Sequence, residues 1–347
     1  MTQILDQGKF VSGSVAHTTK YHDWSEIDFI ENIVRNFCKN NNFDYKDSYA
    51  KNLDFLDGPY DKVLVLYTRE LMPTQERWAD IDSQCADKGK MLYVISDVWG
   101  HMSDLPHIKF FLRPELSGVW SSFTAPARLS IKKLFSCFVQ RVESVRQSWF
   151  YFLSALGLLE QGYVSFWFDQ LTKQHGATRQ EVFENNHFDF GLDQLPHFQL
   201  AYQTLKNQVP YCNFQGDIET LLAESKYCIV LETYATQDSH TAFACNEKTF
   251  RELQFGAQPL IFAQPGLLKA LAQKGMWIPE YLMPVDQTPQ WQARQRLLLD
   301  MLSQDTVNLS DHENLQRALH NRNTMQVWRD NYHKTQFFDE IFDQISQ

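Results

Sequence analysis

Apolar runs that alternate with amphipathic segments constrain the fold of this chain more than any other feature. The run at 63–67 (Val-Leu-Val-Leu-Tyr) has no charged position, which is typical of a strand in a parallel sheet covered on both faces. After it, Trp78, Ile81 and Cys85 share one helical face. A second apolar run at 91–95 completes a strand–helix–strand unit, and such units predict parallel strands joined by crossover helices.

The same alternation continues through the second half of the chain. Apolar runs at 134–139, 163–168, 227–231 and 259–263 predict further strands, and 144–159 has the apolar spacing of a helix. A chain of 347 residues exceeds what one hydrophobic core usually organises. We therefore expect an α/β protein of two domains with parallel sheets.

A stretch at 117–126 that is rich in Ser, Thr, Gly and Pro predicts the linker between these domains. The first domain would then span 1–125, with one more strand at 108–112, and the second would span 126–320. The remaining residues, 321–347, end in apolar side chains at helical spacing, which predicts an amphipathic helix packed on a domain.

Charge and composition exclude several classes of protein. The chain has 32 Lys and Arg against 42 Asp and Glu, a net charge of −10, so it has no overall basic field for binding nucleic acid. Its most apolar segment, 149–159, is too short to span a bilayer, and 1–10 lacks the pattern of a signal peptide. We therefore expect a cytoplasmic protein without a transmembrane segment, whose scattered cysteines stay reduced.

The clearest binding pattern follows the apolar run at 227–231. Glu232 comes directly after that run, and ligands of open parallel sheets bind beyond the carboxyl ends of the strands. Asn246 is a good N-cap, which places Glu247 and Lys248 in a first helical turn, where free N–H groups and the helix dipole favour an anion. The alternative is that Glu247 only complements the dipole and that Lys248 is solvated.

Together with their surroundings, these residues resemble the donor-site region of a group of bacterial and viral GT-B-type glycosyltransferases. The family pattern is an E-T strand end, a T-E-K-T-F-K helix start, a G-x-P-F-I strand and a G-x-L-K helix. The same segment of this chain also resembles, more distantly, a region of the α1,3-fucosyltransferases. The matching residues here are Glu232-Thr233, Asn246-Glu247-Lys248-Thr249-Phe250-Arg251, Phe255-Gly256-Ala257-Gln258-Pro259-Leu260-Ile261 and Gly266-Leu267-Leu268-Lys269.

The resemblance covers about 134–275, where Arg141 and Arg146 lie around a strand-to-helix turn similar to an arginine-rich turn of that family. Arg141 would leave the end of a strand as a rigid fork that is always charged. For Arg146, the alternative is a residue on the surface. The departures from the family pattern are Asn246 in place of Thr, Arg251 in place of Lys and Leu260 in place of Phe.

The resemblance implies a GT-B-like fold, in which a Rossmann-like acceptor domain (1–125) and a Rossmann-like donor domain (126–320) face a cleft and 321–347 crosses back to the first domain. It implies metal-independent transfer of a sugar from a nucleotide-sugar donor to a saccharide or other hydroxyl acceptor in surface polysaccharide synthesis, with no cofactor. Glu247 would contact the ribose and Lys248 the phosphates. The donor-binding residues expected on this basis are Arg141, Arg146, Glu232, Thr233, Asn246, Glu247, Lys248, Thr249 and Arg251.

Candidates for a catalytic base come from the first domain. Inverting transfer needs a carboxylate or His that can reach the acceptor hydroxyl, whereas a retaining enzyme can act without one. Glu70 follows the apolar run at 63–67, and Asp97 and His101 follow the run at 91–95, so all of them lie near the carboxyl edge of the predicted sheet. The sequence leaves open whether transfer inverts or retains, and which sugar and nucleotide are used.

Competing signals are weaker. Asp80-Ile81-Asp82 matches the D-x-D of metal-dependent GT-A transferases, whose carboxylates hold a divalent cation against a diphosphate. It falls inside an amphipathic helix with Ile81 toward the core, so we interpret the match as a coincidence. The chain has no zinc-ligand spacing, P-loop or G-x-G-x-x-G. The remaining alternative is a non-catalytic nucleotide- or carbohydrate-binding protein of the same fold.

Overall fold

This computed structural model describes most of the second half of the chain and separate parts of the first half. The described residues are 2–6, 36, 43–47, 56, 61–67, 75–96, 99–100, 102–113, 130–139, 144–166, 211–232, 235, 242–243, 245, 247–307, 309–333 and 336–346. The chain divides into two compact units. The first comprises Met1–Thr124, His240–Phe250 and Arg322–Gln347, and the second comprises Ala125–Ser239 and Arg251–Asn321.

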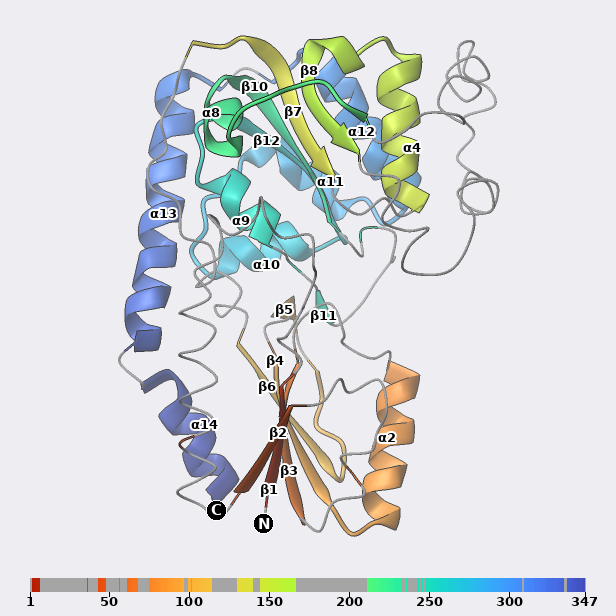
Figure 1. The fold of residues 1–347 in the computed structure, drawn as a ribbon, viewed down its shortest axis with the longest axis vertical. Helices are drawn as coiled ribbons and strands as arrows, with labels where there is room; N and C mark the ends of the chain where they lie inside the picture. The colour runs from red at the N-terminus through yellow and green to blue at the C-terminus, as the bar shows by residue number, and fades with distance from the viewer. Residues whose placement is uncertain are drawn as a thin grey trace. The chain divides into compact units, whose positions relative to one another are not determined.

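The first unit contains a parallel five-stranded sheet (Figure 1). Its order is β2 (Phe43–Asp47), β1 (Thr2–Asp6), β3 (Lys62–Tyr67), β4 (Met91–Ser96) and β6 (Ile108–Leu112). β3 and β4 pair in parallel with Lys62 opposite Met91, and β4 pairs in the same way with β6. The strands expected at 63–67, 91–95 and 108–112 are therefore confirmed.

Helix α2 (Gln75–Asp87) covers one face of this sheet, as the apolar spacing predicts. Trp78, Ile81 and Cys85 pack in one buried cluster with side chains from β3, β4 and β6. The indole of Trp78 meets the ring of Phe110 edge-on at 5.1 Å between centroids. Gly89, just beyond the helix, has φ +62°, a conformation that glycine adopts without steric cost.

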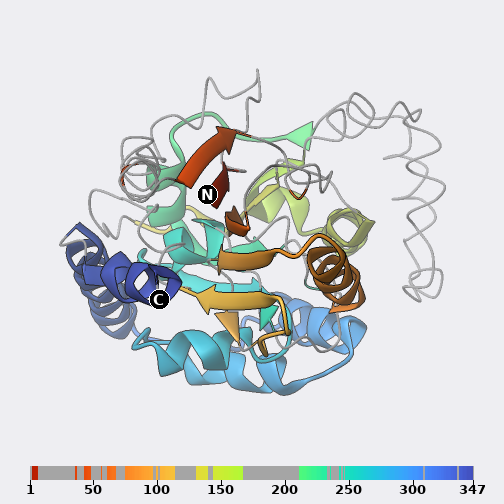
Figure 2. The ribbon, with the colours of Figure 1, turned by 90° about the horizontal axis from the view of Figure 1, so that it is seen from below.

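Helix α14 (Gln336–Ser346) lies on the face of the first sheet opposite α2 (Figure 2). Phe338 and Ile341 are buried, and Phe338 stacks on Phe342 at 5.6 Å between ring centroids. Arg113, which follows β6, donates to Glu340 at 3.5 Å. A short antiparallel pair of β5 (Trp99–Gly100) and β11 (Ala242–Phe243) also belongs to this unit, so it joins segments far apart in the sequence.

The second unit contains another five-stranded sheet, parallel except for one edge strand. The order is β12 (Gln258–Phe262), β10 (Ser225–Leu231), β7 (Lys133–Val139), β8 (Gly162–Phe166) and the antiparallel β9 (Tyr211–Cys212). Each of the four apolar runs predicted in this half contributes a parallel strand. The expected α/β class with parallel sheets is thus confirmed.

Short helices surround the second sheet, and two helices have residues in both units. Trp149 of α4 meets Phe262 of β12 at 5.7 Å between ring centroids. The helical elements of the second unit are α4 (Ser144–Ala155), η4 (Leu159–Gln161), α8 (Ile218–Ala223), α10 (Leu267–Gln273), η6 (Glu280–Leu282), α11 (Met283–Gln287) and α12 (Trp291–Ser303). The two that span both units are α9 (Glu247–Leu253) and α13 (Asp311–His333).

The buried positions of α13 in the second unit are mostly polar, with Ala318 as the apolar one. Asn314, Arg317 and Asn321 lie at helical spacing and expose at most 1% of their surface. Arg317 donates to the carbonyl oxygens of Leu253, Phe255 and Ala257 at 2.8–3.0 Å. The end of α9 and the start of β12 are thus held to α13 by hydrogen bonds to backbone carbonyls as well as by packing.

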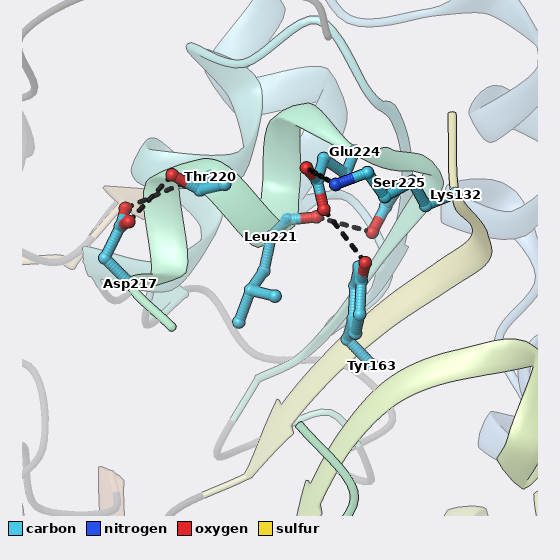
Figure 3. A network of polar contacts seen from close by, with 7 residues as sticks. All are labelled: Lys132, Tyr163, Asp217, Thr220, Leu221, Glu224 and Ser225. Carbon is cyan, nitrogen blue, oxygen red and sulfur yellow. Dashed lines mark hydrogen bonds and ion pairs between the residues drawn. The ribbon is translucent and has the colours of Figure 1, made fainter. Parts of the chain in front are cut away.

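A polar network holds together the strands that begin at the amino edge of the second sheet (Figure 3). Glu224 precedes β10 and accepts from the ammonium of Lys132 at 2.5 Å and from the hydroxyl of Tyr163 at 2.9 Å. Its backbone carbonyl accepts from the N–H of Lys132 at 2.8 Å. Asp217 caps α8 by accepting from the N–H of Thr220. This network lies at the end of the strands opposite to the carboxyl edge.

Acidification is expected to remove the contribution of Glu224 to stability. The hydrogen bonds from Lys132 and Tyr163 lower the pKa of Glu224 below its ordinary 4.5, although burial opposes them. Because the folded pKa is the lower one, the ionised carboxylate stabilises the fold above pH 4.5, and this stabilisation is lost as the pH falls through the folded pKa. The melting temperatures of wild type and Glu224→Gln should therefore differ at neutral pH and converge in acid. A difference that stayed constant with pH would contradict this explanation.

Within the described residues, no helix combines the length and apolar character needed to cross a membrane. The five described cysteines are all free thiols. Four of them, Cys85, Cys137, Cys228 and Cys245, are buried, and Cys212 is exposed. Burial raises the pKa of the Cys85 thiol to about 11, so this group is protonated and unreactive at neutral pH.

Candidate functional site

The carboxyl edge of the second sheet places Glu232 where the sequence predicts it. Glu232 follows β10 directly, and its N–H donates to the carbonyl of Phe262 at 2.9 Å, which extends the pairing between β10 and β12 by one residue. Its side chain is 3% exposed. A carboxylate is therefore buried at the edge of a parallel sheet where ligands of such folds bind.

Arg146 reaches the same strand end from α4. Its side chain is 2% exposed, and its Nε and Nη2 donate to the carbonyl oxygen of Leu231 at 3.2 and 3.0 Å. The alternative of a surface position for Arg146 is wrong, because α4 packs against the sheet and its first turn faces the end of β10. Arg146, 85 residues before Leu231 in the sequence, thus binds the backbone of the residue that precedes Glu232.

Sequence reasoning missed a second buried arginine at this edge. Arg294 of α12 is 1% exposed, and its Nη2 donates at 2.5 Å to the carbonyl of Ala235, in the segment after β10. Its Nη1 donates to the carbonyls of Thr288 and Pro289. The next residue, Gln295, donates to the hydroxyl of Ser148 on α4. No motif marks Arg294, because its role depends on a carbonyl 59 residues away.

The carboxylate of Asp286, a residue of α11, lies at the amino end of α10, which follows β12 at the same edge. Its carboxylate accepts from the N–H groups of Leu268 at 2.9 Å and Lys269 at 3.1 Å. Burial raises the pKa of Asp286 above its ordinary value, although these hydrogen bonds and the charge of Arg294 oppose the shift. The free N–H groups at the start of α10, which attract anions in many folds, are here satisfied by a carboxylate of the protein itself.

Helix α9, expected to begin near Asn246, runs from Glu247 to Leu253 in the connection between β10 and β12. Thr249 is fully buried and Lys248 is partly exposed. Arg251 is buried, and its Nε and Nη2 both donate to Glu252 at 3.2 and 2.6 Å. The charge of Arg251 therefore already has a carboxylate beside it. Its contact with a diphosphate, like that of Lys248, stays a prediction.

Several predicted site residues lie outside the described residues. Among the expected donor-binding residues these are Arg141, Thr233 and Asn246, and for Glu247 the structure describes the backbone but not the side chain. The base candidates Glu70, Asp97 and His101 also lie outside, as does the predicted linker at 117–126. Their expected roles stay predictions.

The D-x-D match has structural contacts in α2. Asp80 pairs with Arg77 at 3.5 Å on the helix surface. Asp82 accepts from the backbone N–H of His107 at 2.7 Å, which ties α2 to the turn before β6. In the part of the chain that the structure describes, no group of His, Cys, Asp and Glu side chains is arranged to hold a metal ion.

Comparisons of the chain with protein-family models, with curated proteins and with solved structures found no match. The resemblance to glycosyltransferases therefore depends on the motif residues themselves, and what they do must be argued from their chemistry and position.

Proposed function

We propose that this protein is a glycosyltransferase that moves a sugar from a nucleotide-sugar donor to a hydroxyl acceptor without a metal ion. The acceptor class would be a saccharide of a surface polysaccharide, and the two units would form a GT-B-like pair of Rossmann-type domains. In this proposal the donor binds at the carboxyl edge of the second sheet, and the first unit supplies the acceptor site.

The observation that carries this proposal is the charged carboxyl edge of β10. Glu232 is buried directly after the strand, and Arg146 is buried against the carbonyl of the preceding residue. Burying ionisable side chains is costly, and several of them at the edge of a parallel sheet where ligands bind make that edge a candidate ligand site. Adjacent parallel strands β10 and β12 end at this edge, and the E-K-T-F-R run forms the helix between them.

The chemistry proposed for this edge is stabilisation of a leaving diphosphate. Transfer of the sugar breaks the bond between its anomeric carbon and the diphosphate, so negative charge grows on the leaving phosphate oxygen. Lys248, in the first turn of α9, and Arg141, after β7, are the cations proposed to oppose that charge. A carboxylate beside them, Glu247 in this proposal, would accept hydrogen bonds from the ribose. Arg146, which holds the end of β10, would support this site without touching the phosphates.

Lys248→Ala is expected to weaken donor binding by about 10- to 100-fold, the value of a charge-assisted contact to phosphate. The measurement is thermal stabilisation of the protein by UDP-, GDP-, ADP- and CMP-sugars, because a ligand that binds only the folded state raises its melting temperature. Lys274→Ala, at an exposed position after α10, is the matched control and should bind as wild type does.

Two results would overturn parts of this proposal. If Lys248→Ala bound the stabilising donor as tightly as wild type, the phosphate site would be wrongly assigned. Release of nucleoside diphosphate from the same donor separates catalysis from binding alone. Saturable binding without release, tested with a panel of saccharide acceptors, would make the protein a nucleotide-sugar binder and not a transferase.

A further inference from the structure

The junction of α11 and α12 contacts the segments that follow two neighbouring strands of the second sheet. Asp286 lies in α11, and Arg294 lies in the first turn of α12, eight residues later. Both side chains are buried, with 4% and 1% of their surface exposed. Neither belongs to the motif that resembles the glycosyltransferase donor site.

Asp286 holds the segment after β12. Besides its carboxylate contacts with the N–H groups of Leu268 and Lys269, its backbone carbonyl accepts from the N–H of Gly266 at 3.0 Å. Gly266 has φ +89°, so the turn into α10 is sharp and needs a residue without a side chain. The start of α10 is thus fixed at several backbone groups by one residue.

Arg294 holds the segment after β10. A guanidinium is planar and rigid, so contacts with several carbonyls at once fix their relative positions. Here it joins Ala235, after β10, to Thr288 and Pro289, which lie between α11 and α12. The charge of Arg294 also acts on Asp286, since it lowers the pKa of that carboxyl against the effect of burial.

We propose that Asp286 and Arg294 are positioning residues that hold the segments after β10 and β12 in one arrangement for a nucleoside diphosphate. The nature of the ligand rests on the proposed function, whereas the mechanical coupling rests on the contacts alone. A ligand at this edge lies between the segments that follow adjacent strands. Fixing both segments in advance removes the entropic cost of ordering them when the ligand binds.

Amide hydrogen exchange of the unliganded protein tests the coupling. If the two segments are coupled, each substitution should change exchange in both of them, including the segment that the substituted residue does not contact. In Arg294→Lys, which keeps the charge but loses the fork, amide exchange should rise about tenfold at 267–269 as well as at Glu232 and Ala235. In Asp286→Asn, which keeps one acceptor oxygen, amide exchange should rise by a similar factor at Glu232 and Ala235 as well as at 267–269. Each variant thus reports on the segment that the substituted residue does not contact. A rise confined to the contacted segment in both variants would overturn the coupling.

Arg317→Lys is the matched control, because Arg317 is also a buried arginine on three carbonyls of the same unit. In this variant, amide exchange should rise near 253–257 and stay unchanged in the segments that follow β10 and β12. If Arg317→Lys gave the same pattern as Arg294→Lys, general loosening of the unit would explain the result and the inference would fail.

Binding of UDP, GDP and ADP to the same variants separates this inference from the proposed function. We expect the tightest of these ligands to bind about tenfold more weakly to Arg294→Lys and unchanged to Arg317→Lys. Unchanged binding to Arg294→Lys would overturn the positioning role and leave the proposed function standing. If wild type bound none of them, the nucleotide proposal would fail. Amide exchange in the segment that each substituted residue does not contact would still show whether the two segments are coupled.

Discussion

Arg317→Ala is expected to lower the free energy of unfolding by about 3–5 kcal/mol, because it removes the donor to the carbonyls of Phe255 and Ala257 and one of the two donors to the carbonyl of Leu253. Each such loss costs about 1–3 kcal/mol, and removal of a buried charge returns part of the total. The desolvation of this charge is visible in the pKa of Arg317, which burial lowers below its ordinary value. Urea unfolding followed by circular dichroism measures the change.

Two further variants make the expectation for Arg317 specific. Arg317→Met keeps most of the volume of the side chain but donates no hydrogen bond, so it should be nearly as destabilised as the alanine variant. Arg296→Ala, at an exposed position of α12 in the same unit, should change stability by less than about 0.5 kcal/mol. An Arg317→Met protein as stable as wild type would show that packing, and not the contacts to carbonyls, accounts for the role of this residue.

Trp78→Ala is expected to destabilise the first unit by about 3–5 kcal/mol, the usual cost of removing a large aromatic side chain from a core. Trp78 is 1% exposed and packs with residues of α2, β3, β4 and β6 in one cluster. Its truncation leaves a cavity between helix and sheet and removes the edge-on contact with Phe110. Thermal unfolding, followed by the near-ultraviolet signal of the aromatic residues, reports the loss.

The neighbouring residue supplies a control for Trp78. Arg77 pairs with Asp80 on the surface, with 48% and 66% of the two side chains exposed, so Arg77→Ala should cost at most about 0.5 kcal/mol. Trp78→Phe retains an aromatic ring and should lose less stability than Trp78→Ala. Equal stability of Trp78→Ala and wild type would mean that the cluster does not hold α2 to the sheet.

The strands β4 and β10 were predictable because nearly all of their residues are buried. The runs at 91–95 and 227–231 became β4 and β10 with bounds shifted by no more than two residues, and 108–112 became β6 without a shift. A strand covered on both faces must be apolar at nearly every position, and a run of that kind needs no information from distant residues. The two-residue strands β5, β9 and β11 carry no such signal and were missed. The five-residue strands β1 and β2 were missed as well, because Asp6, Asp44, Lys46 and Asp47 interrupt their apolar residues.

The part of helix α13 before residue 321 was missed for a different physical reason. Helical periodicity detects a helix whose buried face is apolar. The buried positions of α13 in the second unit include Arg317 and Asn321, whose guanidinium and amide groups bond to backbone carbonyls and N–H groups of other elements. Those partners come from distant segments, so no local pattern reports them.

The amino-acid sequence by itself indicated where the most apolar strands run, β10 among them, and therefore which residue stands at the carboxyl edge of β10. Glu232 was placed there correctly, because it directly follows an apolar run. Only the tertiary structure shows which buried polar side chains form hydrogen bonds with the backbone at that edge. Arg146, Asp286 and Arg294 act on backbone atoms of Leu231, Leu268 and Ala235, and backbone atoms are the same in every residue. Side chains that bond to the backbone leave no complementary residue in the sequence, so only the fold reveals them.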